Sequence, residues 1–80
     1  MTGELKTIHT KDYKGDAIVY YEMDIKFQTP YNNYTYFSLE GETKQGFVDR
    51  IWYEMKKTYN VREFLYNDQE TQERRGFMVA

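Results

Sequence analysis

The chain lacks cysteine altogether, and it has no apolar run near the roughly 18 residues of a membrane span. Without cysteine there can be neither a disulfide framework nor thiolate metal ligands. A secreted domain of this size usually needs such a cross-link, so we expect a reducing, intracellular setting. Residues 1–16 are polar and charged, unlike a signal peptide. We therefore expect a cytoplasmic protein that does not contact membranes.

Residues for catalysis and metal binding are equally scarce. The one histidine, His9, has no carboxylate close to it in the sequence, and nucleophilic catalysis needs a nucleophile, a base and an orienting group. The five glycines form no phosphate-binding arrangement. Glu22 and Asp24 share one face of a predicted strand, but no further ligands converge on them, and a solvated strand face is the simpler interpretation. We predict a protein that is not an enzyme and holds no metal or cofactor.

The charges are nearly balanced, with 13 acidic side chains and 11 basic ones, so neither sign is in large excess. A protein that binds duplex DNA normally carries a basic excess, because neutralisation of phosphates dominates its affinity. A mimic of DNA would need many more carboxylates. Aromatic residues, in contrast, are abundant, with nine tyrosines among 80 residues. Each buried tyrosine hydroxyl needs a hydrogen-bond partner, so we expect several tyrosines at the surface.

The pattern of apolar residues predicts one α+β domain over residues 1–80. Residues 17–27 alternate strictly, with one wholly apolar row, which is typical of a strand covered on one face. Gly15 lies in a predicted hairpin turn and Pro30 in a predicted break. The polar segment 67–75 is compatible with a hairpin loop, a short helix or disorder. Further strands are predicted at 4–10, 34–40, 61–66 and 76–80.

Residues 44–59 change to the helical period. At about 100° per residue, six apolar side chains fall within an arc of roughly 140°. Thr43 is the predicted N-cap, and Lys56 and Lys57 suit the negative end of the helix dipole. The expected fold is an antiparallel sheet of four to five strands with one amphipathic helix packed on one face, in the order βββαββ.

A single helix covers only one face of such a sheet, and the other face is then free to bind a partner. We place Ile18, Tyr20, Glu22, Asp24 and Lys26 on this open face, together with Tyr34, Tyr36 and Ser38. In the third strand we expect Phe37 and Leu39 to face the core. The predicted binding residues are Tyr20, Glu22, Asp24, Tyr34 and Tyr36 on the open face, with Tyr53 of the helix as a separate contact.

Tyrosines among carboxylates suit a protein partner whose apolar pockets are rimmed by lysine and arginine. Our leading hypothesis is an inhibitor or regulator that occludes a basic, nucleic-acid-binding site of another protein. The Lys-, Asn- and Tyr-rich composition fits an AT-rich phage or mobile-element genome. The alternative is a single-stranded nucleic-acid-binding domain that stacks bases on the same tyrosines. A homodimer through the open face is a third hypothesis, and tyrosines that only stabilise the sheet are a fourth.

Overall fold

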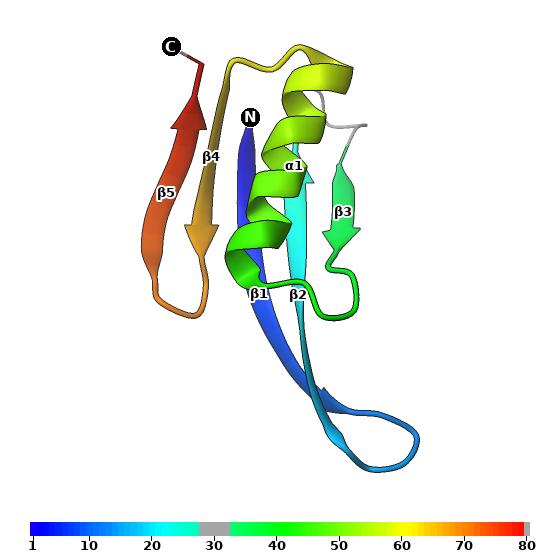
Figure 1. Ribbon diagram of the computed structural model, residues 1–80. Helices are drawn as coiled ribbons and strands as arrows, with labels where there is room; N and C mark the ends of the chain where they lie inside the picture. The colour runs from blue at the N-terminus through cyan, green and yellow to red at the C-terminus, as the bar shows by residue number, and fades with distance from the viewer. Residues whose placement is uncertain (28–32, 80) are drawn as a thin grey trace.

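The computed structural model describes residues 1–27 and 33–79, so the predicted break at Pro30 and the last residue, Ala80, lie outside the described residues. Five strands and one helix follow one another in the predicted order βββαββ, which confirms the α+β class (Figure 1). Their bounds are β1 Thr2–Lys11, β2 Ala17–Lys26, β3 Tyr34–Phe37, α1 Lys44–Tyr59, β4 Glu63–Asp68 and β5 Glu73–Met78.

The strands form one sheet in the order β3-β2-β1-β4-β5. All neighbours are antiparallel except β1 and β4, which are parallel. The prediction of a wholly antiparallel sheet is therefore wrong at this pair. The reason is the helical crossover: α1 returns the chain to the end of the sheet where β3 began, so β4 runs in the same direction as β3 and β1.

Helix α1 has the bounds that the sequence predicts, because both of its ends are capped. The Thr43 hydroxyl accepts a hydrogen bond from the backbone N–H of Gly46 at 3.0 Å. At the other end Asn60 adopts the left-handed conformation, with φ 53°, and its N–H donates to the Met55 carbonyl. Asparagine tolerates this conformation better than most residues, so it ends the helix at little cost.

The core lies between α1 and one face of the sheet. Phe47, Val48, Ile51 and Met55 of α1 are buried there, as predicted from their arc. Each such side chain contributes about 1.5–3 kcal/mol through its burial. Tyr59 and Trp52, which belong to the same arc, are only partly covered. The sheet supplies Leu5, Met23, Ile25, Tyr36, Phe64 and Tyr66.

The polar segment 67–75 is a hairpin. β4 continues to Asp68, the chain turns through residues 69–72, and β5 begins at Glu73, earlier than predicted. The sequence gives no strand signal at residues 73–75 because they belong to an edge strand whose side chains are exposed there. β3 also ends earlier than predicted, at Phe37.

The hairpin of β1 and β2 is longer than the sheet that surrounds it. The two strands pair over ten residues, but β4 accompanies β1 only as far as Leu5, and β3 accompanies β2 only over Glu22–Ile25. Residues 7–20, here called the arm, therefore form a two-stranded ribbon that projects past α1 (Figure 1). It closes at the predicted turn, where Gly15 has φ 88°.

Candidate protein-binding face

The sheet face opposite α1, called the open face, is where the sequence predicts a binding site. Figure 1 shows α1 lying across one side of the sheet only. In β2, Met23 and Ile25 are buried against α1, so the alternate residues Glu22 and Asp24 project from the open face. The same alternation places Tyr20 and Ile18 there. The predicted facing of β2 is thus confirmed over residues 22–25, whereas Ala17 and Val19 of the predicted covered row are exposed in the arm.

In β3 the predicted facing is wrong. Tyr36 pairs with Met23 and Tyr34 pairs with Ile25, so both tyrosines lie on the α1 side of the sheet. Tyr36 is buried, with 8% of its surface exposed, whereas Phe37 projects from the open face and is 56% exposed. The alternation carried no signal because three of the four residues of β3 are aromatic. Hydrophobicity favours phenylalanine over tyrosine for the core, and the register of the strands reverses that order.

Burial of Tyr36 has an electrostatic consequence. Desolvation, together with the nearby Glu54 carboxylate and the hydroxyls of Tyr59 and Tyr34, raises the pKa of the Tyr36 phenol to about 12. Its ring packs edge-on against Tyr34, with 4.7 Å between the ring centroids. Tyr34 itself is exposed at the edge of the sheet. These two tyrosines therefore line the β3 side of the core and do not contribute to the open face.

The apolar part of the open face is a cluster of four side chains, called the Tyr20 cluster: Ile8, Ile18, Tyr20 and Phe37. The rings of Tyr20 and Phe37 lie 6.5 Å apart between centroids, at an angle of 51°. Ile8 is directly opposite Tyr20 in the register of β1 and β2. Phe37 and Ile18 are both exposed. This is an uncovered apolar surface that the chain itself does not bury.

Charged side chains border the Tyr20 cluster. The Lys6 ammonium lies 2.8 Å from an Asp24 carboxylate oxygen and 3.6 Å from one of Glu22. The hydrogen bond from Lys6 is the largest cause that lowers the pKa of Asp24, and Thr35 donates a second one at 3.0 Å. The Glu4 carboxylate is held by the amides of Asn67 and Gln69. Lys6 thus pairs with two of these carboxylates, and Glu4 is bonded to neutral amides, so this part of the open face is acidic.

Tyr53 is on the outer side of α1, as predicted. It is 62% exposed, and the Lys57 ammonium lies 5.8 Å from its ring centroid. It therefore belongs to a surface separate from the open face.

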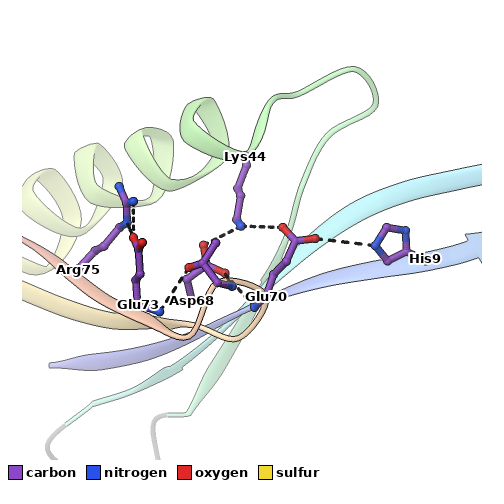
Figure 2. Close-up of polar contacts among 7 residues, drawn as sticks. His9, Lys44, Asp68, Glu70, Glu73 and Arg75 are labelled. Atoms are coloured by element: carbon purple, nitrogen blue, oxygen red, sulfur yellow. Dashed lines mark hydrogen bonds and ion pairs between the residues drawn. The ribbon is translucent and has the colours of Figure 1, made fainter.

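A second polar cluster lies where the N-terminal end of α1 meets the β4–β5 turn (Figure 2). The buried Asp68 carboxylate is 2.6 Å from the Lys44 ammonium and accepts hydrogen bonds from the N–H groups of Glu70 and Thr71. Burial alone would raise the pKa of Asp68, but these donors outweigh it and hold the pKa below its usual range. The Lys44 contacts join α1 to the turn, and the two N–H bonds to Asp68 hold the turn itself, so the cluster stabilises the fold.

The fold brings His9 close to a carboxylate that is distant from it in the sequence. Its Nε2 lies 3.9 Å from a Glu70 carboxylate oxygen, and both side chains are well exposed (Figure 2). Within residues 1–27 and 33–79, no three or more histidine or acidic side chains come together in a way that would hold a metal ion.

Comparison of this chain with protein-family models, with curated proteins and with solved structures finds no match. Its function is therefore argued from its own residues. In the described part of the chain no helix combines the length and the apolar character of a membrane span.

Proposed function

We propose that this chain is a small, non-catalytic, cytoplasmic protein-binding module that docks through its open face and occludes a basic site of another protein. The observation that carries the proposal is the Tyr20 cluster, an exposed apolar surface bordered by carboxylates on the sheet face that α1 leaves uncovered. As an inhibitor or regulator encoded by a phage or mobile element, it would need no catalytic residues.

Tyr20 and Phe37 supply the kind of contact that dominates binding energies. Aromatic side chains at the centre of an interface bury a large area and lose little conformational entropy, and a few such residues carry most of the affinity. The rings of Tyr20 and Phe37 already lie against each other, so the surface is formed before a partner arrives. Pre-organisation of this kind lowers the entropic cost of binding.

The carboxylates indicate the chemistry of the partner. Glu4, Glu22 and Asp24 carry one more negative charge than Lys6 and Lys26 balance, since the alternation of β2 places Lys26 on the same face. A partner with lysine or arginine around an apolar pocket would complement this surface, and it would associate faster at low ionic strength. Nucleic-acid-binding sites of proteins have this basic character.

The experiment is affinity capture from the host with the tagged chain, compared with its Tyr20→Ala/Phe37→Ala double variant. Both substitutions are on the exposed face, so the circular dichroism spectrum should be unchanged while capture of the partner is lost. Tyr53→Ala is the separate test of the contact predicted on α1. Capture that survives the double variant would refute docking through the open face.

The second candidate, a single-stranded nucleic-acid-binding domain, is favoured by the two aromatic rings on an open sheet. Base stacking in this candidate requires Tyr20, Tyr34 and Tyr36 on one face, but Tyr34 and Tyr36 lie on the other side of the sheet. Glu22 and Asp24 also repel a phosphate backbone. Fluorescence anisotropy with labelled oligonucleotides at low salt separates the two proposals. Tight, salt-sensitive binding would reverse their order.

A further inference from the structure

The arm has a strand edge that nothing in the described part of the chain covers. The hydrogen bonds between β2 and the β3 side end at Tyr21, which donates its N–H to the Ser38 hydroxyl and accepts from the Ser38 N–H. Because every second residue of a strand directs its backbone groups to the same edge, Val19 and Ala17 direct theirs outward as Tyr21 does. The pairing with β3 does not extend to either of them.

This edge lacks the features with which proteins usually protect an edge strand. Residues 17–20 read Ala-Ile-Val-Tyr, a segment of β-forming, uncharged residues without proline. Ile18 and Val19 are both exposed. The nearest charges along the strand are Asp16 and Glu22, which flank the segment and do not interrupt it. Such an edge is a template for the addition of another strand.

A groove of about 740 Å³ lies beside the same edge, between the arm and the loop that connects β3 to α1. Val19 and Leu39 give it apolar walls, and both are exposed. Glu42 on its rim binds the Arg50 guanidinium, but Glu40 makes no ion pair with any described residue. The groove thus offers apolar walls and a carboxylate, that of Glu40, without an ion-pair partner among the described residues.

The tip of the arm carries side chains of the complementary kind. Tyr13 is 93% exposed, and the Lys14 ammonium lies 5.6 Å from its ring centroid. Lys14 has no carboxylate within ion-pairing distance in residues 1–27 or 33–79. An aromatic ring with an adjacent unpaired cation fits a groove with apolar walls and an unpaired carboxylate.

We propose that two copies of this chain pair antiparallel along the free β2 edges of their arms, residues 17–20, so that the tip of each arm lodges in the groove of the other copy. In antiparallel pairing the base of one arm lies beside the tip of the other, which brings Tyr13 and Lys14 of one copy to Leu39 and Glu40 of the second. One twofold axis forms both contacts at once, and the pairing occupies the free β2 edge of both arms, so no third copy can add at that edge. The lining of the groove also includes Ile18 and Tyr20, so the lodged tip covers the arm side of the Tyr20 cluster, and dimer formation competes with docking through that cluster.

The test is sedimentation velocity of the untagged chain over the micromolar to submillimolar range. We expect a dimer whose dissociation constant rises by at least about tenfold in Val19→Lys, because the twofold axis brings the two lysines close together and buries their charges. Val19→Thr is the matched control, since it keeps a β-branched side chain at this position and should leave the dimer intact. Val19 is outside the core, so thermal unfolding verifies that both variants fold.

A charge exchange tests the contact between tip and groove. Lys14→Glu and Glu40→Lys each place like charges together in their own homodimers and should weaken them. An equimolar mixture of the two variants restores both pairs and should form a heterodimer. A chain that is monomeric throughout the range overturns the proposal. So does a dimer that Val19→Lys leaves intact, or one that only Tyr20→Ala/Phe37→Ala dissociates.

Discussion

Replacement of Asp68 by alanine should unfold much of the population, because this carboxylate joins α1 to the β4–β5 turn. The substitution removes the 2.6 Å contact with the Lys44 ammonium and leaves the N–H groups of Glu70 and Thr71 without their acceptor. Removing one partner of a buried ion pair costs about 3–5 kcal/mol. Lys44 retains Glu70 as a partner and is partly exposed, so we expect a somewhat smaller loss, about 2–4 kcal/mol. A domain of this size has only about 3–5 kcal/mol of net stability.

The assay is urea unfolding at neutral pH, with Glu70→Ala as the control, because Glu70 is the exposed partner of Lys44 and its loss should shift the midpoint far less than the loss of Asp68. The pH dependence gives a second test. The pKa of Asp68 is lowered in the folded state, so its stabilising effect is present above the pKa of the unfolded chain and is lost as the pH falls through the folded pKa. Asp68→Asn should remove that part of the acid dependence. A stability loss below about 1 kcal/mol in Asp68→Ala would refute the assigned structural role.

Three further predictions concern the core and its titration. Phe64→Ala should destabilise the fold by about 3–5 kcal/mol, since Phe64 is fully buried. Urea unfolding should show a lower midpoint, and an unchanged midpoint would contradict the burial of Phe64. Gly3→Ala should cost about 1–3 kcal/mol, because a Cβ there would lie 2.9 Å from the Met23 sulfur and from Phe64 Cζ; an unchanged midpoint would contradict that packing. The raised pKa of Tyr36 means that its contribution to stability is complete below the ordinary tyrosine pKa and is lost as the pH rises through about 12. Burial also raises the pKa of Tyr66, so ultraviolet titration should show late phenols of which Tyr36→Phe removes one, and a late phase of unchanged amplitude in that variant would contradict the assignment to Tyr36.

The sequence predicts the helix and β2 well because each has a single strong periodicity. Thr43, Lys44 and Tyr59 are where the pattern puts them, and the apolar row of β2 identifies its covered face. The parallel pairing of β1 with β4 depends on where the crossover lands, which is a property of the whole fold and is not encoded in either strand.

The candidate site is predicted only in its β2 half for a related reason. Tyr20, Glu22 and Asp24 belong to a strand with clear alternation, whereas Tyr34 and Tyr36 belong to a short strand in which aromatic residues occupy both faces. Hydrophobicity cannot choose between Tyr36 and Phe37 there, and the pairing with Met23 decides it. The ion pairs of Lys6 with Glu22 and Asp24 come from the register of β1 and β2, which a single sequence does not specify.

The most direct test of docking through the open face uses the absence of cysteine. Thr35→Cys places a single thiol beside the Tyr20 cluster, and Gln45→Cys places one on the exposed side of α1. The measurement is the alkylation rate of each thiol, alone and with the captured partner. We predict that both react readily in the free protein and that the partner protects only the thiol at position 35. Equal rates at that position with and without partner, or protection at position 45 instead, would contradict the assignment of the open face.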